Sequence, residues 1–224
     1  MCMNYIFDAH CHFKGEKLAD NITGLITNAA QYSDWDLIIH AMVSDSRVWG
    51  AIGIHPWYVS DTVDAWDEKL EHELDLHPGL MVGEIGLDKN KPDMEKQIAF
   101  FTKQLEIANC AKRGVHIHCV GMWDTVREIL QQNDFSQIPF FLFHRFSGAA
   151  GDIAMLIKKH NAYFSYRGND NSAKIHAVPV DRLLTESDSD TPQTCAQWAT
   201  DMVAMRGVTA DTFYNNAKRM IENG

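Results

Sequence analysis

Short apolar runs alternate along this chain with polar stretches in which apolar residues recur at helical spacing. Such runs, bounded by turn residues, are typical of buried strands. We predict strands over residues 4–12, 22–29, 48–54, 80–85, 115–119, 138–143, 162–166 and 181–188. The spacing predicts helices over 34–43, 62–77, 93–112, 122–133 and 151–159, and two more inside 195–222, split near Gly207. Ser33 is the predicted N-cap of the first helix.

This alternation predicts an α/β fold with a parallel sheet that helices cover. Histidine, glutamate or aspartate stands at the ends of the first, fourth, fifth, sixth and eighth predicted strands. In an open sheet, side chains from strands so far apart rarely converge, whereas the strand ends of a closed barrel ring one mouth. We therefore expect residues 1–224 to form a single (β/α)8 barrel of the TIM type.

Composition narrows the class of protein without changing the predicted fold. The chain has 224 residues, 46% of them hydrophobic and 22% charged, which suits one globular domain. The net charge of −10 has the wrong sign for a broad nucleic-acid-binding face. No apolar run is long enough for a membrane span, and no signal peptide is recognisable. The five scattered cysteines argue against a disulfide framework, so we expect a reducing, cytoplasmic location.

Two histidine pairs are the first candidates for metal ligands. His10 and His12 stand at the end of the first predicted strand, and His116 and His118 repeat the pattern in the fifth. Side chains two apart in a strand point to the same face, so each pair can grip one ion. The alternative for each pair is ordinary core or exposed histidines, and spacing alone leaves open which member of the second pair is a ligand.

Glu84 is the second unusual feature, because it lies within an apolar strand. Burying a carboxylate is costly unless the group is paired or binds a metal. A buried ion pair and a hydrogen-bonded carboxylate are the alternatives to a metal ligand. His144 ends the sixth predicted strand, and Glu186 and Asp188 end the eighth.

The order of these motifs resembles the TatD-type metal-dependent hydrolases, a branch of the amidohydrolase-like barrels. The resemblance covers nearly the whole chain and rests on DAHCH, GIHPW, GEIGLD, VHIHC, FHRFSG, DRLLTESD, the helix face with Gln97, Phe100, Gln104, Leu105 and Ala108, and Asn216-Ala217-Lys218-Arg219. Each motif is weak by itself, but together and in this order they are specific.

The resemblance implies a site for two divalent metal ions. Its ligands would be His10, His12, Glu84, His118, His144 and Asp188. Glu84 and Asp188 would be the catalytic residues: Glu84 would bridge both ions, and Asp188 would act on the attacking water. The alignment selects His118 as the ligand, which leaves His116 as a core histidine one layer deeper in the barrel.

Other positions are implied to lie around the ions rather than on them. His55 aligns with a histidine on the substrate side, and Trp57 follows it where the strand ends and is expected to line the pocket. Glu186 is expected to orient Asp188 or a histidine. Imidazole and carboxylate ligands suit Zn, Mn or a similar ion, with Mg as a further candidate.

The chain also departs from the family pattern. Val120 stands where the family usually has an arginine, and Ser189-Asp190 replaces the usual Ser-Pro. The segments after His12, near 168–176 and near 189–194 are shorter than usual. Arg145 occupies a position where a smaller residue is common, so it either replaces the missing phosphate clamp or pairs with a surface acid.

The implied activity is hydrolysis of an ester bond by a water that the metal ions activate. A phosphodiester is the expected substrate, as DNA trimmed from its 3′ end, a short oligonucleotide or a small phosphoester. The same site would serve a carboxylic ester, an amide or an aminoacyl ester. A metal-binding relative without catalysis is the third alternative, which the complete ligand set disfavours.

Overall fold

Eight parallel strands form one sheet in the order β1 to β8, each strand pairing with the next along the chain. The structure is a computed structural model that describes residues 6–15 and 17–222. The strands are β1 (Ile6–Cys11), β2 (Ile22–Asn28), β3 (Val48–Ile52), β4 (Met81–Asp88), β5 (Val115–Val120), β6 (Phe141–His144), β7 (Ala162–Tyr166) and β8 (Leu183–Thr185).

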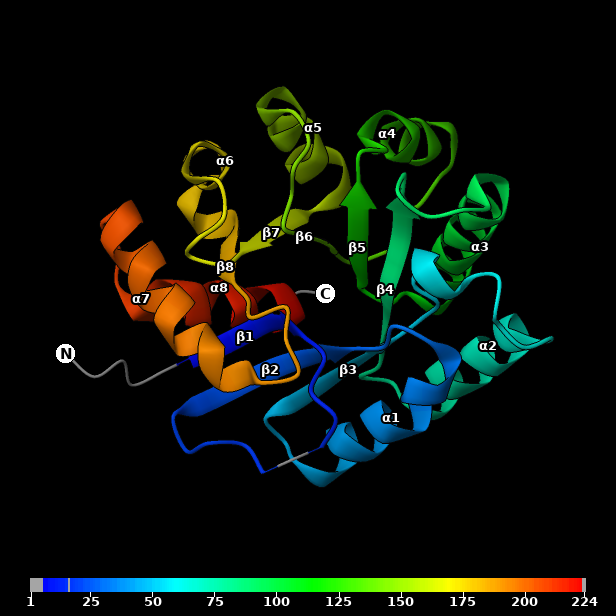
Figure 1. Cartoon of the computed structure of the whole chain (residues 1–224), viewed down its shortest axis with the longest axis horizontal. Coiled ribbons are helices and arrows are strands. Elements are labelled where there is room, and N and C mark those ends of the chain that lie inside the picture. Colours follow the sequence, from blue (N-terminus) through cyan, green and yellow to red (C-terminus); the bar gives the residue numbers. More distant parts are fainter. Residues whose placement is uncertain (1–5, 16, 223–224) are drawn as a thin grey trace.

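Helices follow most of the strands and lie outside them, around the ring (Figure 1). They are α1 (Trp35–Ser44), α2 (Trp66–Leu76), α3 (Met94–Ala111), α4 (Trp123–Gln132), α5 (Ala150–His160), α6 (Ser172–Ala177), α7 (Cys195–Arg206) and α8 (Ala210–Glu222). Four short 3-10 segments join them: η1 (Tyr32–Asp34), η2 (Pro56–Tyr58), η3 (Val180–Arg182) and η4 (Pro192–Thr194). None of the described helices is long and apolar enough to cross a membrane.

The ring closes where the end of β1 meets the segment that follows β8. The backbone N–H of Asp188 donates to the carbonyl of His10 over 3.0 Å, and that of His12 donates to the carbonyl of Ser189 over 2.8 Å. The predicted (β/α)8 barrel is confirmed. Closure also brings the first and last candidate ligands of the chain together.

Alternation along β5 and β6 shows which side chains point into the barrel. Ile117 and Phe143 belong to the apolar core that the surrounding helices cover. His118 and His144 alternate with them and therefore face the opposite, inner side of the ring. The apolar layer outside thus fixes the orientation of the histidines inside.

Several details of the predicted elements differ from the structure. The first helix begins at Trp35 without a side-chain cap, so Ser33 is not its N-cap and lies in η1. β6 begins only at Phe141, because Pro139 has no N–H for a sheet hydrogen bond. β8 is three residues long, so Asp188 lies beyond it. Asn4 and Tyr5, predicted in the first strand, are outside the described residues.

Helix α6 is a further difference, because the sequence predicted only a short loop in this region. The side chain of Asn171 accepts hydrogen bonds from the N–H groups of Ala173 and Lys174, which is the usual way that asparagine caps a helix. A helix of six residues has too few apolar positions for a recognisable period.

Gly86 permits the close contact of β4 with β5 beside the mouth of the barrel. Its φ is +152°, and a Cβ at this position would lie 1.8 Å from the carbonyl oxygen of His118. We predict that Gly86→Ala lowers the free energy of unfolding by at least about 2 kcal/mol, because the strands must separate. Urea denaturation measures the change.

Gly79→Ala is the matched control, since no atom lies within 4 Å of a Cβ built there. Its free energy of unfolding should stay within about 0.5 kcal/mol of the parent. Equal stability of the two variants would contradict the role given to Gly86.

Candidate metal centre

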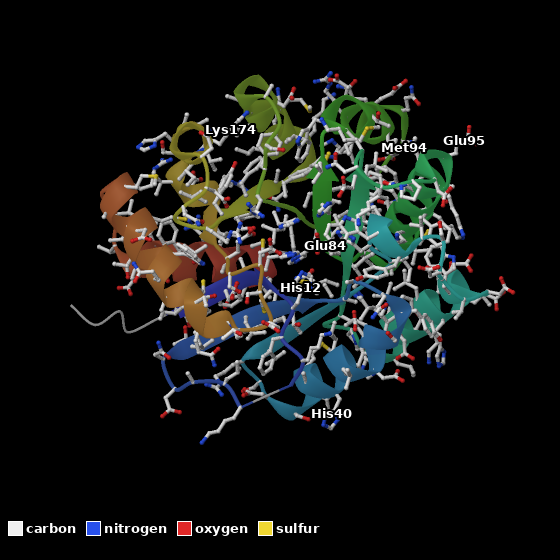
Figure 2. The ribbon with its side chains drawn as sticks, in the orientation of Figure 1. His12, His40, Glu84, Met94, Glu95 and Lys174 are labelled. Carbon is white, nitrogen blue, oxygen red and sulfur yellow. The ribbon has the colours of Figure 1, made fainter. Side chains whose placement is uncertain are left out.

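The six predicted metal ligands converge at one end of the barrel. His10, His118 and His144 lie in β1, β5 and β6, and Glu84 lies in β4. His12 and Asp188 follow the ends of β1 and β8. Figure 2 shows His12 and Glu84 in the middle of the ring, whereas Lys174 lies out on α6.

The Glu84 carboxylate lies between two sets of imidazole nitrogens. Its Oε2 is 3.3 Å from Nε2 of His10 and 3.4 Å from Nε2 of His12. Its Oε1 is 2.8 Å from Nδ1 of His118 and 2.9 Å from Nε2 of His144. Two ligands of one zinc ion are roughly 3.0–3.4 Å apart, depending on the coordination geometry. Oε2 therefore has neighbours at the spacing of metal ligands, whereas Oε1 lies at hydrogen-bonding distance from His118 and His144.

Asp188 completes the side of the site that contains His12. Its Oδ1 is 3.6 Å from Nε2 of His12, and its backbone has a φ of +49°. Donor atoms of His10, His144 and Asp188 lie within 4.8 Å of one another. The same holds for His10 with His12 and Glu84.

His55 lies closer to the candidate ligands than a substrate contact requires. Its Nε2 is 3.3 Å from Oε1 of Glu84, and it forms a third group of donor atoms with Glu84 and His118. Burial lowers the pKa of His55 to about 4, so its imidazole is neutral near pH 7. A neutral imidazole at this position can bind a metal or accept a hydrogen bond.

Charge balance within the site keeps Glu84 ionised. Burial by itself raises the pKa of this carboxyl group, but the charges of His144, His55 and His10 outweigh burial and hold the pKa well below its usual value. Burial likewise lowers the pKa of His12, yet the hydrogen bond to Asp188 and the charge of Glu84 raise it to about 9. Burial also lowers the pKa of His144, but the charge of Glu84 raises it well above its usual value. Without metal, protons on His12 and His144 therefore neutralise the buried carboxylate.

The residues present fit divalent metal ions. Nε2 of His10 is buried and has no hydrogen-bond partner among the described residues, although it points toward Glu84. No thiol belongs to the candidate groups of donor atoms among the described residues. Burial raises the pKa of the neighbouring Cys119 to about 12 and that of Cys11 well above its usual value. The donor set is thus imidazole and carboxylate, which suits Zn or Mn.

Neighbouring groups fix the orientation of the histidine rings. Nδ1 of His12 donates to the carbonyl of Asn28 over 3.0 Å, which leaves Nε2 free to face Glu84. Glu186 is fully buried, and its Oε1 lies 3.6 Å from Nδ1 of His144 while its Oε2 accepts a hydrogen bond from Ser165. Glu186 thus lies beside a histidine, one of the two positions expected for it.

His116 lies one layer deeper than the candidate ligands. It is fully buried, and its Nδ1 is 3.4 Å from Nδ1 of His10, so one ring can donate to the other. Burial holds its pKa well below the usual value, which keeps the ring uncharged. The His-x-His pattern could not distinguish a ring that faces Glu84 from one that supports it.

Three polar residues without a predicted role position the site: Asp8, Gln97 and Gln104. Oδ1 of Asp8 accepts hydrogen bonds from the N–H groups of His10 and Ser187, which joins the two sides of the barrel seam. Gln97 and Gln104 of α3 are fully buried and accept hydrogen bonds from the N–H groups of Asp88 and Ile54. Buried glutamines on an apolar helix face were the available signal.

A cavity of about 640 Å³ opens above the candidate ligands. The three predicted substrate contacts, His55, Trp57 and Arg145, all line it, and so does Val120. The guanidinium of Arg145 lies 3.0 Å from Oδ1 of Asp170 and 3.4 Å from Oδ2 of Asp188. Arg145 therefore pairs with acids, as one of its two alternatives states, and does so on the wall of the cavity.

A barrel with imidazole and carboxylate donors at its mouth is the architecture of a metal-dependent hydrolase. The family model described as TatD related DNase matches residues 7–219. The chain belongs to this family, as its motifs indicated.

The individual relatives share only a minority of their residues with this chain. The chain is 28% identical to the 3′-5′ ssDNA/RNA exonuclease TatD of Pectobacterium atrosepticum, over 77% of this chain and 70% of that protein. It is 26% identical to the uncharacterized metal-dependent hydrolase YjjV of Escherichia coli, over 81% of this chain and 78% of that protein.

Solved structures show the same fold. The crystal structure of YjjV from Escherichia coli superposes with a TM-score of 0.82 at 19% identity, covering 96% of this chain and 97% of that one. A hydrolase of the TatD family from Entamoeba histolytica gives 0.80 at 13% identity, covering 98% and 99%.

The raised pKa of His12 predicts that metal affinity depends on pH. Below about pH 9 this ring carries a proton in the metal-free folded chain, and a metal ion must displace it. Each displaced proton makes the affinity rise about tenfold per pH unit. We expect zinc affinity to increase from pH 6.5 toward pH 9, as measured by calorimetry in buffers with different ionisation enthalpies. A flat profile with no proton release would contradict this assignment.

Proposed function

We propose that this chain hydrolyses a phosphodiester at a centre that holds two divalent metal ions. The observation that carries the proposal is the position of Glu84. One of its oxygens faces His10 and His12 and the other faces His118 and His144. His55 is a third imidazole at the second oxygen, 3.3 Å away. A carboxylate with imidazoles at both of its oxygens is suited to bridge two ions.

Bound ions would activate a water molecule and neutralise the charge on the phosphoryl oxygens. Asp188 is the proposed general base, because its carboxylate lies at the mouth of the site and remains ionised. Burial raises the pKa of this carboxyl group, but the hydrogen bond to His12 outweighs burial and leaves the pKa below its usual value. Asp188 accepts the proton of the attacking water and passes it to the leaving oxygen.

Arg145 supplies the positive charge that the family usually provides from the position of Val120. Its guanidinium lines the cavity and lies 3.4 Å from Asp188, so it reaches the place where the water would attack. Planar guanidinium groups bind two oxygens of a phosphoryl group at once. The pair with Asp170 holds the side chain in this orientation.

The names of relatives support a phosphodiester in nucleic acid as the bond that is cut. TatD of Pectobacterium atrosepticum is a 3′-5′ ssDNA/RNA exonuclease. For this chain we propose the end of a DNA strand, a short oligonucleotide or a small phosphoester. The same donor set could serve a carboxylic ester or an amide, so a substrate screen should include these classes.

Metal content tests the proposed centre directly. Protein purified without added metal should contain about two equivalents of Zn, Mn or Fe by elemental analysis. His118→Ala and Asp188→Ala should each hold less, because each variant removes one ligand. His40→Ala is the matched control, since His40 lies on α1 away from the cavity (Figure 2) and should leave the content unchanged. Protein that neither contains nor takes up metal would overturn the proposal.

Loss of the guanidinium of Arg145 should weaken phosphoester binding. We expect Arg145→Ala to raise KM for a phosphodiester roughly tenfold, with a smaller change for an uncharged carboxylic ester. Arg145→Lys should restore part of the loss by retaining the charge. Arg127→Ala, which removes a cation paired with Asp124 and Asp152 outside the cavity, is the control. An unchanged KM in Arg145→Ala would leave Arg145 with its ion pairs alone.

A further inference from the structure

One part of the cavity wall is apolar, although Lys14 and Asp34 line the cavity from the same connections. Resting on the proposed phosphoester activity, we propose that this apolar part is a subsite for one apolar, planar substituent of a small phosphoester. Its members, Phe13, Leu37, Ile38, Trp57 and Tyr58, come from the connections that follow β1, β2 and β3. The substrate class that fits is a phosphate ester with an aromatic group beside the phosphorus.

Trp57 is the rigid part of this subsite. Its indole N–H donates to Oδ2 of Asp88 over 2.7 Å, and Nζ of Lys91 lies 4.1 Å from the ring centre. The ring centre is 6.5 Å from that of His118, at an interplanar angle of 81°. Despite these contacts, 49% of the residue is exposed. An aromatic surface held in place beside the candidate ligands is pre-organised for stacking.

Leu37 is the second exposed apolar member of the subsite. It lies in the first turn of α1, off the face on which Trp35, Ile38 and Ala41 are buried, and it is 49% exposed. Five large apolar side chains are exposed among the described residues: Leu37, Val43, Trp57, Val63 and Leu76. The two that line the cavity are Leu37 and Trp57, which suggests an apolar ligand there rather than scattered surface residues.

The cations of the cavity suit one phosphoryl group rather than a polymer. Arg145 is paired with Asp170 and Asp188, and Nζ of Lys14 lies 3.9 Å from Asp34. Lys174 donates to the carbonyl of Gly148. Binding of a long single strand depends on many cations that replace counterions along its backbone. A chain with a net charge of −10 and paired cations at its mouth is poorly suited to that task.

Two phosphonates separate the subsite from the metal centre. Phenylphosphonate and methylphosphonate share the anionic group and resist hydrolysis, so they differ only in the substituent that the subsite would hold. With the metal-loaded protein, calorimetry should give a Kd for phenylphosphonate at least about tenfold lower than for methylphosphonate. Trp57→Ala and Leu37→Ser should each reduce this preference severalfold, and Leu37→Ser should leave methylphosphonate binding unchanged.

Val43→Ser is the matched control, because Val43 is 70% exposed on the same helix and does not line the cavity. Its preference for phenylphosphonate should equal that of the parent. Leu37→Ser also controls for an indirect effect of Trp57→Ala through Asp88, because Leu37 takes no part in the hydrogen bond between the indole of Trp57 and Asp88.

Each outcome tests a different part of the two proposals. Equal affinity for the two phosphonates would overturn the subsite and leave the proposed function intact. Binding of neither would overturn phosphoryl recognition, and with it both proposals. Thymidine 5′-monophosphate and a ten-nucleotide oligothymidylate should bind within about threefold of each other, with a weak salt dependence. Much tighter and steeply salt-dependent binding of the oligonucleotide would overturn the proposal of a small ester as substrate and would support a polymer.

Discussion

The rest of the site depends on a carboxylate buried at the centre of the barrel. Glu84 is almost inaccessible to water, and four of its neighbours within 3.4 Å are the imidazoles of His10, His12, His118 and His144. Removing a carboxylate from water is costly unless positive charge surrounds it. Protons on His12 and His144 supply that charge in the metal-free chain, and divalent ions would supply it in the loaded one. We therefore expect metal binding to stabilise the fold.

The barrel makes this arrangement possible by keeping the strands rigid and close. Helices cover the outer faces of β5 and β6, so the alternating side chains point inward. Gly86 lets β4 approach the backbone of His118, and Asp8 joins β1 to the segment that carries Asp188. These supports lie outside the donor set, yet they determine the distances within it.

Specificity is separated from chemistry in this cavity. A water molecule activated at the donor set could attack phosphorus or a carbonyl carbon. The residues that line the cavity above the donor set differ from place to place. Arg145 is a charged member of the lining, and Trp57 and Leu37 are exposed apolar members. Val120 adds to the apolar lining where the family usually has a cation. Members of one family can thus retain the hydrolytic centre while the residues at the strand exits select the substrate.

The sequence by itself determined the barrel and predicted the candidate donor set. Hydrophobic periodicity identifies buried strands locally, and the order of the motifs places one donor after another at their ends. Only the tertiary structure decided what each donor contacts. His116 and His118 have the same local pattern, yet one lies under His10 and the other faces Glu84. The contact of Trp57 with Asp88 also escaped the sequence, because the two residues are distant along the chain. The short helix α6 escaped it because six residues show no recognisable period.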